Sequence, residues 1–253
     1  MRTAGLLFLA LIVSSPLARP AALPADCRQL IVGIADSWDS GVGTIQLFER
    51  DGKTWRSVSQ PQRVLFGANG LAWGIGVAGQ DEPGLHKIEG DKRAPAGLFA
   101  LGKIYTYSTG LPAGADYPFY TVRAADAWIS DPALPHYNQH VVVDLANPPP
   151  WFAKQQMRQN DPPHAWKVEI RHNEDPPKPG AGSAIFFHIQ RGENIHSSGC
   201  TTMPRPAILG IVKWLREDQR PHYALLPAAE YRAKWKAWGL PPPKDVAAVG
   251  GHS

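Results

Sequence analysis

Short apolar runs alternate with turn-forming residues along most of the chain, a pattern that predicts strands rather than long helices. Three such runs lie between Gln29 and Gln60: L-I-V-G-I, T-I-Q-L-F-E-R and K-T-W-R-S-V. The Asp51-Gly52 pair between the last two is a strong hairpin signal. Later runs, L-F-A-L, V-V-V-D-L and W-K-V-E-I-R-H, predict further strands. With 24 glycines and 25 prolines to supply turns, the chain is predicted to be mainly β.

Helical spacing of apolar residues occurs only toward the carboxyl end. From Ala207 to Asp218, isoleucine, valine, tryptophan and leucine recur at the period of a helix that packs one face on the sheet. Ala228 to Trp238 predicts a second, more basic helix. From Gly239 onward the chain is so rich in proline, glycine and alanine that we expect a flexible tail.

The first residues resemble a secretory signal peptide. A basic start precedes an apolar core from Ala4 to Val13, which small residues and prolines follow. A core of about ten residues is too short to cross a bilayer, which needs about twenty, so no permanent membrane span is expected after cleavage. We expect cleavage between Ala18 and Asp26 and a protein exported to the periplasm or cell wall.

Composition and charge narrow the function classes. The chain has 253 residues, 43% of them hydrophobic, and nothing divides it clearly in two, so one principal domain is expected. Its net charge of +4 is only mildly basic, and no dense Lys/Arg cluster, helix-turn-helix or zinc-finger spacing indicates a nucleic-acid partner. Gly74 to Gly79 matches G-x-G-x-x-G, but the Q-D-E-P-G-L-H that follows cannot begin a long helix, so no nucleotide is expected.

The candidate chemistry lies where a strand, a polar loop and a predicted helix follow one another. The apolar run of residues 184–189 predicts a buried strand that carries His188, and a polar loop leads from it to Cys200. A thiol attacks carbonyls as its thiolate, so something must lower its pKa. We expect the following helix to do so, with Thr201 or Thr202 as N-cap, together with a nearby imidazole. Gly199 leaves room for substrate, and its amide and that of Cys200 can stabilise an oxyanion.

Alternatives remain open at several of these positions. An exported protein often joins two cysteines, so Cys27 and Cys200 could form a disulfide instead of leaving a reactive thiol. His188 is favoured as base over His196, which contacts substrate or only solvent. Tyr137 lies in a loop that either lines the cleft or packs around a turn. A zinc site is not favoured, because neither H-E-x-x-H nor a paired C-x-x-C occurs.

The stretch H-I-Q-R-G-E-N-I-H-S-S-G-C-T-T-M resembles the active-site segment of the L,D-transpeptidase (YkuD-type) family, in which a strand-borne histidine precedes S/T-x-G-C. The upstream K-I-E-G-D-K-R-A-P-A-G-L-F-A-L-G resembles a second family segment, with Ala94 where threonine is common. The resemblance extends from about Phe66 to Leu215. Two features depart from it: the interval from His188 to Cys200 is short, and Thr202 occupies a position where arginine is common.

The resemblance implies a YkuD-like β-sandwich or barrel with one or two packed helices and a C-terminal tail. The expected divisions are a signal peptide at 1–25, a catalytic domain at 26–225 and a helix with a flexible tail at 226–253. Cys200 would be the nucleophile and His188 the base, oriented by a backbone carbonyl. The other candidate site residues, for the oxyanion or the substrate, are Gly199, Ser198, Thr201, His196 and Tyr137.

The function implied by the resemblance is an exported cysteine acyltransferase, an L,D-transpeptidase, that acts on peptidoglycan stem peptides without a cofactor. Two alternatives stay open. Hydrolysis at the same site would make the protein an L,D-carboxypeptidase, because the acceptor subsite has no motif that can be recognised. The second alternative is a domain that keeps the fold but only binds the cell wall, and this hypothesis predicts that Cys200 is dispensable.

Overall fold

The structure is a computed structural model that describes residues 22–250. The signal peptide predicted for residues 1–25 lies outside these residues except for its last four positions. Among residues 22–250, no helix combines the length and the apolar character needed to cross a membrane.

The strands are β1 Gln29–Ala35, β2 Val42–Asp51, β3 Thr54–Ser57, β4 Gln62–Leu65, β5 Leu71–Trp73, β6 Ala94–Thr106, β7 Phe119–Thr121, β8 Asp126–Trp128, β9 His140–Val142, β10 Trp166–Ile170, β11 Phe186–Ile189, β12 Thr201–Met203 and β13 His222–Pro227. The α-helices are α1 Phe152–Gln155, α2 Arg205–Trp214, α3 Ala228–Trp238 and α4 Ala247–Gly250, and the 3-10 helices are η1 Pro162–His164, η2 Glu217–Gln219 and η3 Pro243–Asp245.

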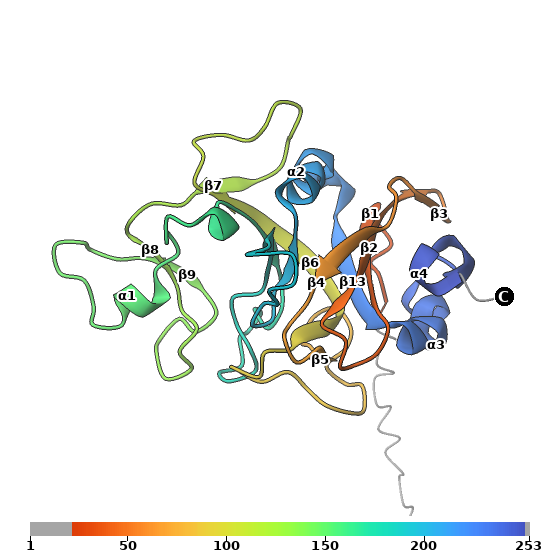
Figure 1. The fold of residues 1–253 in the computed structure, drawn as a ribbon, viewed down its shortest axis with the longest axis horizontal. Helices are drawn as coiled ribbons and strands as arrows, with labels where there is room; N and C mark the ends of the chain where they lie inside the picture. Colours follow the sequence, from red (N-terminus) through yellow and green to blue (C-terminus); the bar gives the residue numbers. More distant parts are fainter. Residues whose placement is uncertain (1–21, 251–253) are drawn as a thin grey trace, which may run out of the picture.

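One sheet closes on itself to form the body of the molecule (Figure 1). Hydrogen bonds run in the order β1, β13, β6, β10, β11, β12, β4 and β2, and β2 pairs back onto β1. The short strands β3, β5 and β7 attach to the outside of this ring, on β2 or β6. The prediction of a mainly β fold is therefore confirmed, and closure leaves the ring without an unpaired edge.

The predicted hairpin is present where the Asp-Gly pair placed it. β2 and β3 pair antiparallel, with Asp51 opposite Thr54, and Gly52 in the turn has φ +56°. A glycine adopts that left-handed conformation without the steric cost of a Cβ. The hairpin is joined to the ring through β2, and β3 pairs with β2 alone.

A side lobe, residues 126–157, lies against one flank of the ring and is seen at the left of Figure 1. It contains the two-stranded sheet of β8 and β9, helix α1, and a small apolar cluster of its own around Ala127, Ile129 and Phe152. Of the V-V-V-D-L run that predicted a strand, only Val141 and Val142 belong to β9, and all five residues are partly or fully exposed in the lobe. Trp128 and Met157 of the lobe belong to a second cluster that faces the ring.

Helix α2 starts and ends earlier than the sequence predicted, at Arg205 and Trp214 instead of 207 and 218. The residues expected to cap it, Thr201 and Thr202, belong to β12, which pairs in parallel with β11. Pro204 occupies the N-cap position. Residues 201–203, between Cys200 and the helix, form β12 of the sheet, so the amino end of α2 lies five positions beyond Cys200.

Helix α3 matches its prediction, but the expected flexible tail is wrong for the described residues. Leu240, Val246 and Val249 are buried in the main core, and the Ala247 amide donates to the side chain of Gln46 at 3.1 Å. Burial of these three apolar side chains stabilises a segment whose composition alone suggests disorder. The boundary expected between 225 and 226 falls inside β13, which pairs with both β1 and β6.

The packed C-terminal segment gives a stability prediction. Val246→Ala should lower the free energy of unfolding by about 2 kcal/mol, because it removes buried methyl groups and leaves a cavity. Ala248→Ser, at an exposed neighbouring position, is the control and should change stability by less than about 0.5 kcal/mol. Urea denaturation measures both. Equal stability of the two variants would mean that the segment is a loose tail.

Candidate active site

The alternation of side chains along β10 and β11 sets the position of the site. Phe187 points into the barrel core, where its ring centroid lies 4.6 Å from that of Tyr223. Its neighbours Phe186 and His188 therefore point to the other side of the sheet. Lys167 on β10 pairs directly with His188, so the two side chains share this outer face.

Cys200 joins this group through the register of β12. Thr201 pairs with Phe187, which places Cys200 next to Phe186 at the start of the strand. Cys200, His188 and Lys167 line one cavity of about 160 Å³ between the ring and the side lobe. The remaining lining residues are Trp128, Ser130, Lys154, Gln155, Gln156, Met157, Gln159, His164, Ala184 and Phe186.

His188 is held neutral in a defined tautomer. Its Nδ1 lies 2.8 Å from the carbonyl oxygen of Ile189, and because a carbonyl can only accept, Nδ1 carries the hydrogen. Nε2 is thereby left as an acceptor. Burial lowers the pKa of His188 to about 3, and the nearby His164, whose ring centroid lies 5.2 Å away, contributes in the same direction. The Ile189 carbonyl is thus the group that orients the imidazole.

The Cys200 thiol is protonated at rest. It donates a hydrogen bond to the carbonyl of Ala184 at 3.5 Å. Burial raises the pKa of the thiol above its usual value, and the Phe186 backbone N–H and the charges of Lys167 and Lys87 offset only part of that effect. The expectation that a helix terminus lowers this pKa is wrong, because β12 separates Cys200 from α2.

The turn before Cys200 differs from the expected oxyanion site. The Gly199 amide donates to Ser197 Oγ at 3.0 Å, and Ser197 Oγ in turn donates to the Cys200 carbonyl at 2.5 Å. The Gly199 amide is therefore already used inside the turn. Glycine is required here, since φ is +153° and a Cβ would lie 3.0 Å from the Arg93 carbonyl oxygen.

Three other predicted site residues lie away from the cavity. Thr201 is buried inside the barrel, with its Oγ1 3.1 Å from the hydroxyl of Tyr223. His196 contacts the carbonyl oxygen of Gly41 through Nδ1 at 3.0 Å. Ser198 is exposed at the surface of the loop. Thr201 points to the opposite side from Cys200 because successive residues of a strand alternate. His196 and Ser198 belong to the irregular loop before Cys200, where sequence spacing does not fix the side to which a residue points.

Tyr137 is not among the residues that line the cavity, and it packs in the protein next to the site. It is buried, and its hydroxyl donates to the carboxylate of Glu89. Ser183 Oγ donates to the same carboxylate at 2.8 Å, so Glu89 ties the side lobe to the segment that enters β11. Tyr137 therefore fits a structural role, one of the two alternatives left open by the sequence.

The neighbouring Asn138 makes the most extensive connection of the site. Its Nδ2 donates to the carbonyls of His172 and Asn173 at 2.8 and 2.7 Å. Its Oδ1 accepts from the Ala184 amide at 2.9 Å and from Trp128 Nε1 at 3.0 Å. Ala184 is the residue whose carbonyl receives the thiol hydrogen, and its φ of +55° is one that few non-glycine residues adopt. Asn138 holds that conformation in place.

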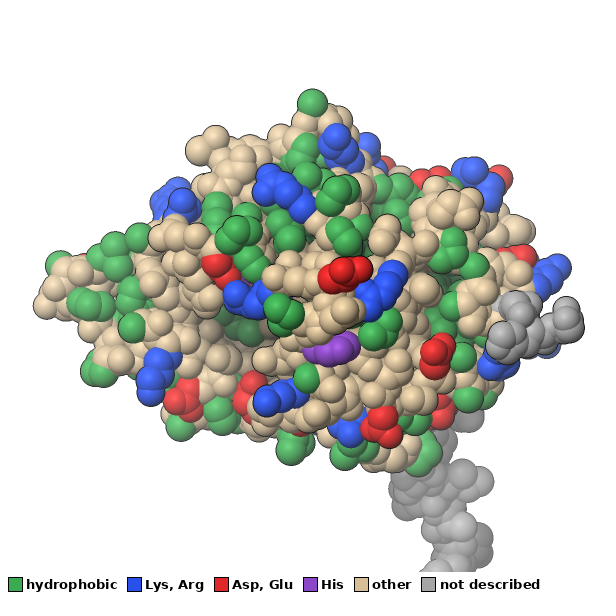
Figure 2. Space-filling model, viewed as in Figure 1, with side chains coloured by type: hydrophobic (Ala, Val, Ile, Leu, Met, Phe, Trp, Pro, Cys, Tyr) green, Lys and Arg blue, Asp and Glu red, His purple; other side chains and the backbone are tan. Residues whose placement is uncertain are grey.

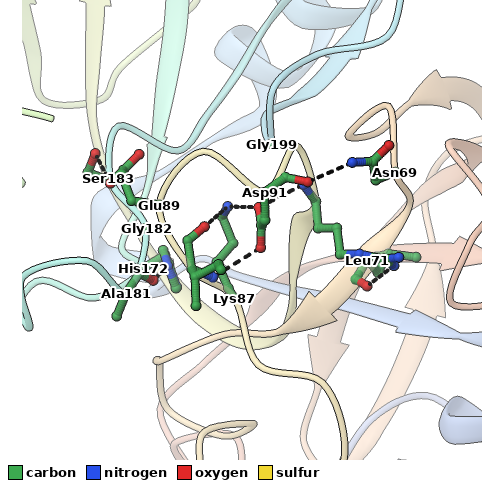
Figure 3. Close-up of polar contacts among 12 residues, drawn as sticks. Asn69, Leu71, Lys87, Glu89, Asp91, His172, Ala181, Gly182, Ser183 and Gly199 are labelled. Carbon is green, nitrogen blue, oxygen red and sulfur yellow. Dashed lines mark hydrogen bonds and ion pairs between the residues drawn. The ribbon is translucent and has the colours of Figure 1, made fainter.

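A buried ion pair lies under the turn that precedes Cys200 (Figure 3). Lys87 Nζ is 2.5 Å from Asp91 Oδ1, and the Asp91 carboxylate also accepts the Arg93 amide at 2.9 Å. The Lys87 side chain packs closely against Gly182 and near Gly199, on either side of β11. These contacts give Asp91 a structural role, and they hold the positive charge of Lys87 near the Cys200 thiol.

The sequence analysis did not identify Lys167, nor two histidines that the structure places in or near the site. Lys167 lies between apolar Trp166 and Val168, yet it is only 4% exposed, and burial lowers its pKa to about 8. His164 lines the cavity. His172 is buried, with Nδ1 accepting from the Ile75 amide at 3.1 Å. Period-2 alternation in W-K-V-E-I places Lys167 on the face opposite to Trp166 and Val168, but the pattern does not show which residue of another strand lies beside it.

Both cysteines are free, so the disulfide alternative is not formed in this structure. Within residues 22–250, no group of three or more His, Cys, Asp or Glu side chains is arranged to hold a metal ion. Comparisons of the chain with protein-family models, curated proteins and solved structures gave no significant match.

The hydrogen bonds of Asn138 predict a large effect on both stability and the thiol. Asn138→Ala leaves the Trp128 indole N–H and the Ala184 amide without their partner, so the free energy of unfolding should fall by about 3 kcal/mol. Alkylation of Cys200 by iodoacetamide should change with it, because the Ala184 carbonyl moves. Asn147→Ala, at an exposed position of the same lobe, is the control and should alter neither measurement.

The buried histidines predict loss of stability in acid. The folded-state pKa values of His188 and His172, about 3 and about 4, lie below the value of about 6.5 for an exposed histidine. The unfolded chain binds more protons below pH 6.5, so stability is complete above that pH and decreases as pH falls toward 4.

Each of the two histidines contributes a slope of at most about 1.4 kcal/mol per pH unit. His188→Gln should reduce the slope between pH 6 and 4 by up to that amount in urea denaturation at constant ionic strength. His86→Gln, which changes an exposed histidine, should leave the slope unaltered. An unchanged slope in the His188 variant would contradict the buried, neutral imidazole.

Proposed function

We propose that this protein is an exported cysteine acyltransferase, an L,D-transpeptidase with a YkuD-like catalytic barrel, that acts on peptidoglycan stem peptides. The observation that carries the proposal is that the Cys200 thiol and a neutral His188, with Nε2 available as acceptor, line the same small cavity. A thiol beside an imidazole that a third group orients is the arrangement of a cysteine nucleophile. The sequence resemblance supplies the substrate class, and the signal-like amino terminus supplies the location.

The first half of the reaction makes a thioester. Nε2 of His188 takes the thiol proton, and the Cys200 sulfur attacks the carbonyl of the L-to-D peptide bond. The charge of Lys167 and the Phe186 N–H stabilise the thiolate as it forms. The tetrahedral oxyanion is stabilised by the Cys200 amide, since that of Gly199 is engaged by Ser197. When the C–N bond breaks, His188 returns the proton to the departing amine of D-alanine.

The second half of the reaction resolves the thioester. An acceptor amine attacks the thioester carbonyl, His188 removes its proton, and the Cys200 sulfur leaves with the proton that His188 returns. The product is a new amide and the free enzyme. If water takes the place of the amine, the same steps release a carboxylic acid, and the activity is that of an L,D-carboxypeptidase.

A domain that only binds the cell wall fits the cavity less well. Lys167, His188 and the thiol are polar groups that lie close together. Burying them lowers the stability of the folded protein, because each group loses hydration. Such groups are retained together where chemistry needs them, whereas a binding surface gains nothing from a buried neutral imidazole.

The test is the muropeptide product pattern with purified protein. Peptidoglycan stem tetrapeptides should give crosslinked dimers or shortened monomers, which differ in mass. Cys200→Ser should remove both products, and His188→Gln should lower the rate by about 10² to 10⁴, because it removes the general base. Cys27→Ser, which changes the second free cysteine, is the matched control and should retain activity. Identical products from wild type and Cys200→Ser would refute the acyltransferase.

A further inference from the structure

The side chains that line the cavity of Cys200 carry no negative charge apart from the thiolate that the cysteine itself can form. Two lysines, Lys154 and Lys167, and two histidines, His164 and His188, are joined there by glutamine, serine and apolar side chains, with no aspartate or glutamate among them. Over the molecule as a whole the two signs are mixed, as Figure 2 shows for one face. The cavity is therefore selectively positive compared with its surroundings.

Lys167 is the unusual member of this set. It is only 4% exposed, and no ion pair involving it occurs among the described residues. Its Nζ lies 5.4 Å from the centroid of the Phe186 ring, a cation–π contact that satisfies no hydrogen-bond donor. The nearest carboxylates that influence it, Asp161 and Asp126, are already engaged, by His164 at 2.9 Å and by His140 at 2.8 Å.

The size of the cavity places the ammonium near the reacting atoms. A volume of about 160 Å³ holds about five water molecules, so it accommodates one small group beside the sulfur and not a whole peptide. Lys167 pairs with His188 across the strands, and both line this space with Cys200. A substrate carboxylate that reaches Lys167 while Cys200 attacks therefore lies close to the scissile bond.

We propose that Lys167 is a specificity-determining residue that binds a carboxylate of the substrate next to the carbonyl that Cys200 attacks, an inference that rests on the proposed function. The substrate class is then a peptide with a free carboxylate on one of the two residues that share the cleaved bond. Arginine or lysine paired with carboxylate is among the strongest polar contacts in proteins, and it gains strength in an enclosed site.

The charge balance of the reaction supports this role. In the resting site the ammonium lies near a thiol that can become a thiolate, but in the acyl-enzyme the sulfur is a neutral thioester. The enclosed ammonium then lacks an anion unless the acyl group brings one, and an unpaired buried charge is costly. A substrate carboxylate would fill that place, so acidic donors are favoured at the thioester stage as well as at binding.

Iodoacetate and iodoacetamide provide a test that needs no peptidoglycan. Both are attacked by the thiolate, which forms a thioether and expels iodide, but only iodoacetate carries a carboxylate next to the reacting carbon. We expect the ratio of the iodoacetate to the iodoacetamide alkylation rate at Cys200, measured with Cys27→Ser protein, to exceed that of glutathione by about tenfold. A ratio equal to that of glutathione overturns the inference.

Variants test whether Lys167 causes the high ratio of the two alkylation rates. Lys167→Met should return the ratio to within about twofold of glutathione, and Lys167→Arg should retain most of it. The iodoacetamide rate alone reports any change in thiol reactivity, and thermal unfolding reports the fold. Lys103→Met, at an exposed site on β6, should leave the ratio unchanged. If Lys154→Met lowers the ratio as much as Lys167→Met does, a general positive field and not Lys167 is responsible, and the inference fails.

Peptide substrates then separate the two sources of the carboxylate. Donor peptides are amidated either at the side-chain carboxylate of the acyl-donor residue or at the terminal carboxylate of the leaving residue. One amidation should lower kcat/KM at least tenfold in wild type and have little effect in Lys167→Met. Failure of both amidations to discriminate, with activity intact, overturns the inference alone. Absence of turnover together with a high iodoacetate ratio would instead count against the proposed function.

Discussion

The site depends on the strict alternation of side chains along two paired strands of a closed barrel. Because β10 and β11 belong to a ring with no free edge, a shift by one residue would expose Val168 and Phe187 and bury Lys167 and His188 in the core. Hydrophobic burial inside the ring therefore fixes the register, and the register places the polar side chains together outside it. The chemistry of the outer face is set by the packing of the inner one.

Much of the architecture could be predicted from local patterns. The hairpin at Asp51-Gly52, the buried strand around His188 and the helix from Ala228 to Trp238 all follow from period and turn residues. The prediction of a flexible C-terminal tail was wrong because it relied on composition and not on the pattern of apolar residues. Its composition suggests disorder, but a few apolar side chains such as Val246 find places in a core whose surface only the folded barrel defines.

Of the residues chosen for the site, His188 and Cys200 line one cavity, whereas residues chosen by nearness in sequence to Cys200 lie elsewhere. His188 and Cys200 line the same cavity because β11 and β12 pair in parallel and Cys200 lies level with Phe186, on the face that also carries His188. Thr201 turns inward next to Cys200, and the Gly199 amide is used by a local bond to Ser197, neither of which a sequence pattern reveals. Lys167 was missed because its opposition to His188 depends on long-range pairing, which single-strand patterns leave undetermined.

Asn138 makes the side lobe part of the barrel and not an independent flap. With four hydrogen bonds that reach the lobe, the end of β10 and the entrance of β11, it links three segments through one buried amide. The bond to Trp128 lies within the lobe, so a hinge motion of the lobe would have to break the other three bonds, to His172, Asn173 and Ala184, together. The lobe side of the cavity around Cys200 is therefore held at a fixed distance from the barrel side, and any molecule that enters has to fit the cavity without help from a moving lobe.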